Sequence, residues 1–114
     1  MKNSQELDKG TSHIIIQILE YVPNAVVSKT IIKKTTGNIT ATSMAKGEEL
    51  GAKTLAFDTY VQIIDGTAEI KLNGKKLKLQ LGEGITIAAN TKHSFSANEQ
   101  FKMITTVIKS GYDE

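Results

Sequence analysis

The chain has 114 residues, the size of one compact domain with a single hydrophobic core. It has no cysteine, which excludes a disulfide framework, a thiolate nucleophile and a cysteine-ligated zinc site. The net charge is +2 and all 14 basic residues are lysines, so the guanidinium forks that read guanine bases are absent and we expect no nucleic-acid partner.

The first ten residues, MKNSQELDKG, are polar and lack the apolar region of a secretory signal. No apolar run approaches the length of a membrane span, so we expect no membrane association. These features predict a cytoplasmic protein.

Residues 1–12 are predicted to form a loosely ordered segment, because they are polar and include a glycine. The aliphatic run HIIIQILEYV follows at residues 13–22. Residues 14–19 of this run are compatible with either a strand or a short helix, and their isoleucine content favours a strand. Pro23 and Asn24 are predicted to end the element with a turn.

The next segments are β-branched and alternate between polar and apolar residues. This pattern predicts strands at residues 25–34 and 39–45, separated by a break at Gly37 and Asn38. Residues 46–57 include two glycines and are predicted to form a loop.

Two turn signals divide the central part of the chain. Asp65-Gly66 and Asn73-Gly74 each predict a two-residue β-hairpin, because these residues tolerate positive φ angles. The flanking strands are expected at residues 58–64, 67–72 and 75–81. Their alternation predicts an inward face made of Ala68, Ile70, Leu72, Leu77, Leu79 and Leu81.

Further strands are predicted at residues 85–89, 92–97 and 100–109, and the last is apolar on both faces and therefore expected to be well buried. Residues 111–114 are expected to form a tail. About eight or nine short strands with regular turns and no long helix indicate an all-β sandwich or barrel. We expect it to be a single domain spanning residues 13–110.

Two glycine-bounded segments resemble the motifs of a known family. Gly47 and Gly66 have the spacing of the ends of the first cupin motif, which is a glycine, five residues, His-x-His, three or four residues, a glutamate, six residues and a glycine. Gly82 and His93 likewise bound the second motif. From about Glu20 to Lys109 the chain resembles compact single-domain bacterial cupins of the cupin 2, conserved barrel type. The resemblance implies a double-stranded β-helix, or jelly-roll, barrel.

The sequence departs from this family at the residues that would bind metal. Lys53 and Leu55 stand where the first motif has two histidines, Thr59 stands where it has glutamate, and His93 alone is retained. A leucine has no ligating atom, and a protonated lysine cannot ligate. We therefore expect no cofactor, with a bound divalent metal as the alternative; His13 would contribute only if the N-terminal segment covered the barrel mouth.

His93 has two interpretations. It is either a partly buried imidazole that is hydrogen-bonded to the backbone or to a hydroxyl such as that of Ser94 or Thr59, or a ligand-binding group. In the second interpretation Lys53, Thr59 and His93 contact a small polar or anionic ligand inside the barrel. The candidate apolar wall, whose members also suit plain core filling, comprises Leu55, Val61, Ile63, Phe95 and Met103.

These features predict a small cupin barrel with a degenerate metal site that binds a small molecule without catalysing a reaction. The alternatives are a metal-dependent cupin enzyme of isomerase or dioxygenase type with rearranged ligands, and a purely structural dimeric module. A homodimer is expected, because the outward face of the strand that carries Tyr60, Gln62 and Ile64 has more apolar area than a solvated face should have.

Overall fold

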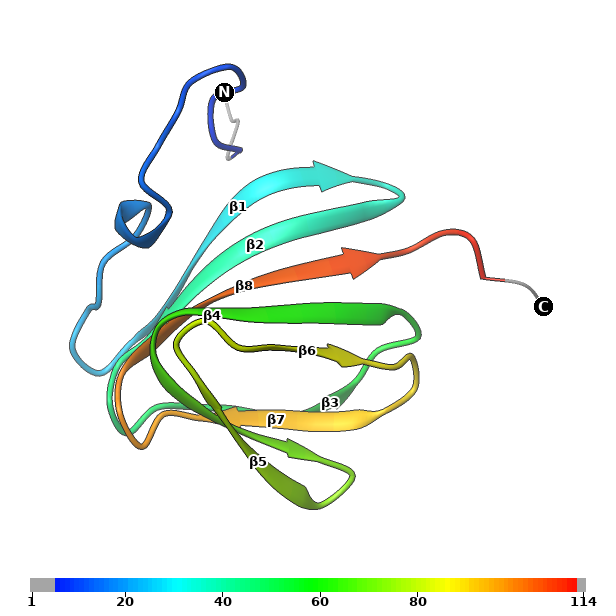
Figure 1. Cartoon of the computed structure of the whole chain (residues 1–114). Helices are drawn as coiled ribbons and strands as arrows, with labels where there is room; N and C mark the ends of the chain where they lie inside the picture. The colour runs from blue at the N-terminus through cyan, green and yellow to red at the C-terminus, as the bar shows by residue number, and fades with distance from the viewer. Residues whose placement is uncertain (1–5, 113–114) are drawn as a thin grey trace.

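The computed structural model describes residues 6–112, which form an antiparallel β structure with one short 3₁₀ helix, η1 (Ile15–Gln17), as Figure 1 shows. The all-β prediction is confirmed. No helix in residues 6–112 is long and apolar enough to cross a membrane. The strands are β1 (Val26–Lys34), β2 (Gly37–Met44), β3 (Glu49–Thr54), β4 (Asp58–Leu72), β5 (Lys75–Gln80), β6 (Gly84–Ile87), β7 (Lys92–Ser96) and β8 (Phe101–Ile108).

The strands form two layers that share β4 (Figure 1). The first layer has the order β1-β2-β8-β4, with β6 pairing the N-terminal half of β4. The second layer consists of β3, β7, β5 and the C-terminal half of β4. This arrangement is the jelly-roll barrel that the resemblance implied, and it leaves an interior between the layers.

The bend of β4 corrects the prediction of a hairpin at Asp65-Gly66. The strand runs through both residues, and the register against β8 shifts between Ile63 and Asp65, which marks a β-bulge. Gly66 has a φ of 75°, and a Cβ added there would lie 2.1 Å from the carbonyl oxygen of Gln100. Glycine is therefore required where the strand passes from one layer to the other.

The prediction of a hairpin at Asn73-Gly74 is confirmed. Asn73 and Gly74 have φ values of 48° and 87°, as a two-residue hairpin with positive φ at both positions requires. Leu81 is 62% exposed and not inward-facing as predicted, because β5 ends at Gln80 and the alternation ends with it. The prediction of burial for the last strand is correct for Phe101–Ile104.

One element prediction is wrong, and one open alternative is decided. The expected loop at residues 46–57 contains β3, which pairs with β7 at the edge of the second layer. For residues 14–19, where the composition favours a strand but is also compatible with a short helix, the structure has the short helix η1. The predicted segment at 1–12 and tail at 111–114 each include residues outside the described range, namely 1–5 and 113–114.

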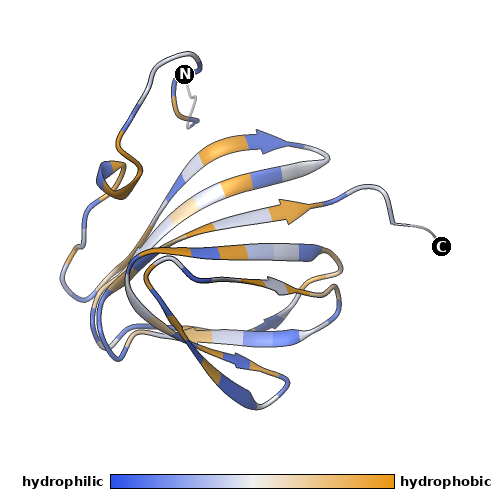
Figure 2. Cartoon of the chain, viewed as in Figure 1, coloured by the Kyte–Doolittle hydropathy of each residue, from blue (hydrophilic) through white to orange (hydrophobic). Residues whose placement is uncertain are grey.

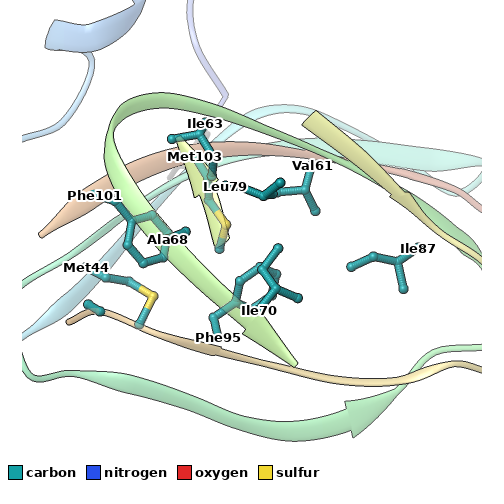
Figure 3. Close-up of a cluster of buried hydrophobic side chains, with 11 residues drawn as sticks. Met44, Val61, Ile63, Ala68, Ile70, Leu79, Ile87, Phe95, Phe101 and Met103 are labelled. Carbon is teal, nitrogen blue, oxygen red and sulfur yellow. The ribbon is translucent and has the colours of Figure 1, made fainter. Parts of the chain in front are cut away.

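The main core lies between the layers and is centred on β4 (Figure 3). Phe101, Met44, Ile63, Ile70 and Val61 are its most completely buried large side chains. Burial of a side chain of this size stabilises the fold by about 1.5–3 kcal/mol. The core joins side chains from β2, β4, β5, β6, β7 and β8, and two of its members, Phe95 and Met103, also line a cavity.

The isoleucine-rich run covers the outer face of the first layer. In Figure 2 the apolar residues around η1 lie beside this layer, and Ile18 and Leu19 pack with Ala41 and Ile104. Ile18 and Leu19 bury apolar area against the sheet without strand pairing, whereas Ile14 and Ile15 remain exposed, so isoleucine content alone did not decide the element.

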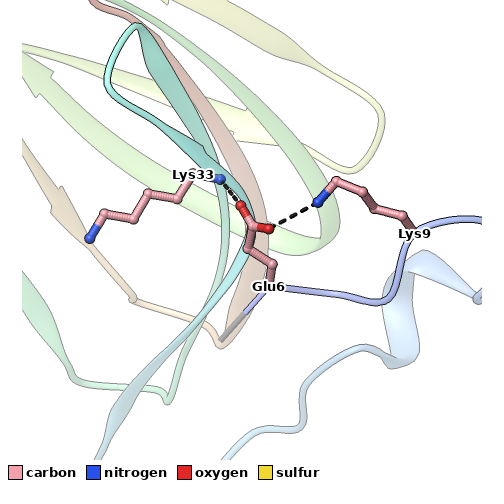
Figure 4. A network of polar contacts seen from close by, with 3 residues as sticks. All are labelled: Glu6, Lys9 and Lys33. Atoms are coloured by element: carbon pink, nitrogen blue, oxygen red, sulfur yellow. Dashed lines mark hydrogen bonds and ion pairs between the residues drawn. The ribbon is translucent and has the colours of Figure 1, made fainter. Parts of the chain in front are cut away.

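Polar contacts attach the same segment to the barrel. Lys102 Nζ is buried and donates to the backbone oxygen of Ile16 at 2.6 Å, and it lies 4.9 Å from the centre of the Tyr21 ring. The Tyr21 hydroxyl donates to Asp65 Oδ2 at 2.6 Å. Nearer the N-terminus, the Glu6 carboxylate accepts a hydrogen bond from the backbone N–H of Lys33 at 2.6 Å (Figure 4). The lysine at its side, Lys9, helps to hold the pKa of Glu6 below its usual value.

Candidate functional site

A cavity of about 280 Å³ lies between β1, β2 and β8 of the first layer and β3 and β7 of the second. Its volume is close to the lower end of the range for small-molecule sites. The polar residues that line it are Ser28, Asn38, Thr40, Thr42, Lys53, Thr59, His93 and Thr105. The apolar ones are Val26, Leu50, Leu55, Phe95, Met103 and Val107.

The structure brings most of the predicted site residues together at this cavity. They are Lys53, Leu55, Thr59, His93, Phe95 and Met103. Val61 and Ile63 are instead buried in the main core and do not line the cavity. His13 is exposed in the N-terminal segment and is not among the residues that line the cavity.

Lys53 reaches the cavity because β3 is irregular. Lys53 pairs with His93 on β7, and Leu50 pairs with Phe95 two residues further along β7. The step from Leu50 to Lys53 is three residues, whereas the step from Phe95 to His93 is two. This register shift places Leu50 and Lys53 on the same side of the sheet. Without the shift, simple alternation would point the two side chains to opposite faces.

His93 is buried at 3% exposure, and its Nδ1 atom lies 3.0 Å from the backbone oxygen of Thr91. A carbonyl oxygen can only accept, so Nδ1 carries the proton and Nε2 of the neutral ring is an acceptor. The ring contacts Phe95 edge-on, with centroids 6.0 Å apart. The partner is thus the backbone, rather than Ser94 or Thr59.

Thr59 has the one buried side-chain polar atom, among the residues the structure describes, that lacks a hydrogen-bond partner. The residue is 5% exposed and lines the cavity. Leaving a buried hydroxyl unpaired costs about 1–3 kcal/mol. A ligand that bonds to Thr59 Oγ1 would offset this cost, so the atom marks a place for a polar group.

A row of polar side chains in the first layer lines the cavity and is not among the predicted site residues. Asn38, Thr40 and Thr42 alternate along β2 and line the cavity, beside Ser28 on β1 and Thr105 on β8. Their signal was visible in the period-two pattern of NITATS, which points one polar set to a single face. The pattern indicates a site only once it is known which face of β2 encloses the cavity.

The positions of the cupin metal ligands meet at this cavity, but their side chains do not suit a metal. Lys53 is a cation, Leu55 is apolar, and Thr59 is a weak neutral ligand, which leaves one imidazole. No group of three or more His, Cys, Asp or Glu side chains converges anywhere in residues 6–112. The residues present therefore do not fit the family's metal centre.

The candidate dimer-face residues lie on the outer side of β4. Tyr60 is 44% exposed and Gln62 is exposed, but Ile64 is half-buried and packs against the outer cluster of Leu19, Ala41 and Ile104. Only Tyr60 and Gln62 are therefore open for contact with a second protein.

Comparisons with known proteins identify the fold and the family. A family model described as D-lyxose isomerase matches residues 17–114. Curated proteins include no match to this sequence. A conserved protein of unknown function from Streptococcus pyogenes has a similar structure, with a TM-score of 0.88 and 25% identity over 98% of each chain.

Two further solved structures carry the cupin description. A cupin superfamily protein from Desulfitobacterium hafniense has a TM-score of 0.85 and 20% identity, covering 96% of this chain and 100% of that one. A cupin 2 conserved barrel domain protein from Leptotrichia buccalis is 30% identical with a TM-score of 0.80, and the match covers 82% of this chain and 46% of that one. The chain therefore belongs to the D-lyxose isomerase family of cupin barrels, and the resemblance carried by Gly47, Gly66, Gly82 and His93 is confirmed.

Proposed function

We propose that the protein binds a small anionic molecule in the cavity between the two layers, with His93, Thr59 and Lys53 holding its polar head. The observation that carries this proposal is the buried, unpaired hydroxyl of Thr59, which lines the same cavity as His93. A buried polar group without a partner is rare in folded proteins and points to a water, ion or ligand as its partner.

The charges around the cavity favour an anion. Among the residues that line the cavity, Lys53 is the one lysine, and none is an aspartate or glutamate. Lys53 also makes no ion pair with a described residue. A carboxylate or phosphate would supply the missing negative charge and accept hydrogen bonds from Lys53 and Thr59.

His93 can support binding in either protonation state. When it is neutral, Nε2 accepts a hydrogen bond from a ligand hydroxyl, and when it is protonated, Nε2 donates to an anion. The Thr91 carbonyl holds the ring orientation in both cases. The site is therefore suited to an acid that also carries a hydroxyl.

A second candidate is isomerisation of a small sugar, which the family description favours. Proton transfer by His93 beside the Lys53 charge is the chemistry that the chain's own residues offer. The metal-dependent isomerase or dioxygenase alternative needs ligands that the positions of Lys53, Leu55 and Thr59 do not provide. Formation of the ketose from D-lyxose, lost in His93→Gln, would establish this second candidate in place of simple binding.

The two histidines allow a direct test of anion binding. Imidazole nitrogen NMR signals are recorded while sodium acetate, and separately inorganic phosphate, is added to the protein at constant pH and ionic strength. We expect the His93 signals to move in a saturable way, and His13, outside the cavity, to serve as the internal control. The response should weaken about tenfold or more in Lys53→Gln. Equal small shifts of both rings would contradict the proposal.

A further inference from the structure

The wall of the cavity that the first layer forms, across from Lys53 and His93, is rich in hydroxyl groups. Ser28, Thr40, Thr42 and Thr105 come from three adjacent strands of the first layer, with the amide of Asn38 beside them. Lys53 and His93 belong to the second layer. The cavity therefore has one wall that offers neutral donors and acceptors and another that offers charge.

These wall groups have hydrogen-bonding capacity to spare. Ser28 Oγ and Thr42 Oγ1 lie 3.2 Å apart and share one hydrogen bond, and Thr105 Oγ1 donates a long bond of 3.5 Å to the Thr40 backbone oxygen. Each hydroxyl can donate one bond and accept two. A partner that both donates and accepts, as an alcohol does, would use this capacity, whereas a hydrocarbon chain would leave it unused.

The register places the hydroxyls at a spacing that suits a short chain of alcohols. Thr40 and Thr42 are two residues apart on β2, which corresponds to about 7 Å along the strand. Thr40 pairs with Thr105, and Thr42 pairs with Ser28. This distance is too long for one hydroxyl group to bond to both pairs, whereas several hydroxyls along a short carbon chain would meet both.

We propose that the ligand is a short polyhydroxylated carboxylic acid, whose carboxylate lies toward Lys53 and whose hydroxyls lie against the wall formed by Ser28, Thr40, Thr42 and Thr105. This inference rests on the proposed anion site and adds the chemical class of the rest of the ligand. The 280 Å³ volume equals that of about nine liquid waters, so an acid of four or five carbons is the right size.

Three four-carbon molecules separate the contributions of charge and hydroxyls. Threonate carries both, butyrate carries the carboxylate alone, and threitol carries the hydroxyls alone. Isothermal titration calorimetry on the unaltered protein should give threonate an affinity at least about tenfold above that of either analogue, since butyrate lacks the hydrogen bonds to the wall and threitol lacks the carboxylate that faces Lys53. This comparison does not depend on any variant folding.

A double variant then assigns the hydroxyl contribution to the wall. Thr40→Val with Thr42→Val keeps the side-chain shape and removes two hydroxyls, so threonate should fall to the affinity of butyrate while butyrate is unchanged. Equal binding of butyrate and threonate by the unaltered protein would overturn the inference and leave the anion site standing. Equal binding of threitol and threonate would overturn the proposal that the ligand carries a carboxylate. Failure of acetate, phosphate and all three four-carbon molecules to bind would overturn the proposed function as well.

Discussion

Lys53 and His93 lie directly opposite each other on β3 and β7, and both line the same cavity although 40 positions separate them in the chain. The register shift in β3 places the exposed Lys53 on the cavity side of the strand, and the Thr91 carbonyl oxygen orients the imidazole through Nδ1. A cation and an imidazole acceptor are thereby presented to the cavity, at positions where cupins have metal ligands.

The orientation of His93 predicts its tautomer. At a pH where the ring is neutral, Nδ1 should carry the proton, because its partner is the carbonyl oxygen of Thr91. Two-bond proton–nitrogen NMR spectra distinguish the two ring nitrogens and require no variant. A neutral ring protonated at Nε2 would show that the Thr91 contact is absent in solution.

Thr59→Val should stabilise the free protein by about 1 kcal/mol, because it replaces an unpaired buried hydroxyl with a methyl group of the same shape. The same change should weaken acetate and phosphate binding, since the hydroxyl is a proposed ligand contact. Urea unfolding and NMR titration measure the two effects. Thr86→Val, at an exposed position on β6, is the matched control for the substitution itself. A destabilised Thr59→Val would mean that the hydroxyl has a partner in the free protein.

Gly66→Ala should destabilise the fold by several kcal/mol. Its Cβ would lie 2.1 Å from the Gln100 oxygen and 2.9 Å from the Phe101 Cα, and φ at this position is positive. Thermal and urea unfolding provide the measurement. Gly51→Ala is the control, because an added Cβ there meets no atom within 4 Å. Similar stability of the two variants would show that β4 does not bend as described.

Tyr21 should make the free energy of unfolding depend on pH in the alkaline range. Burial and the hydrogen bond to Asp65 raise the pKa of Tyr21 above its ordinary value of 10.0. The protonated form is therefore favoured in the folded state, and its stabilising effect is full below pH 10 and declines as the pH rises above it. Tyr21→Phe should be less stable than the unaltered protein by about 1 kcal/mol at neutral pH, and the difference should shrink only above pH 10. Urea unfolding at a series of pH values tests this, and a constant difference would contradict it.

We propose that the protein forms a homodimer through the exposed outer face of β4 around Tyr60 and Gln62. Tyr60→Lys should convert the dimer to a monomer, because it places a charge in an interface that would otherwise bury an aromatic ring. Sedimentation equilibrium measures the mass in solution. Lys78→Gln, on the exposed face of β5, is the control. Ile64 is a poor choice for this test, because it packs under the N-terminal segment and its loss would disturb folding.

Parts of the site could be predicted because they depend on local spacing. The positions of Lys53, Leu55, Thr59 and His93 follow from the intervals between glycines, and all four side chains line one cavity. The hydroxyl wall could not be recognised in the same way. Threonine and serine are common in exposed strands, and only the pairing of β1, β2 and β8 shows that these residues face the interior.

By itself the sequence determined the all-β class, the Asn73-Gly74 hairpin and the lack of a metal-binding set at the cupin positions, because each depends on residue type at a known spacing. The tertiary structure decided whether Asp65-Gly66 would reverse the chain or bend it, since that choice depends on β8 pairing with both residues and on β5 and β7 pairing with the residues that follow. It also decided that residues 13–22 cover a sheet without joining it, and that Lys53 faces His93. These outcomes are contacts between distant segments, and no local propensity encodes them.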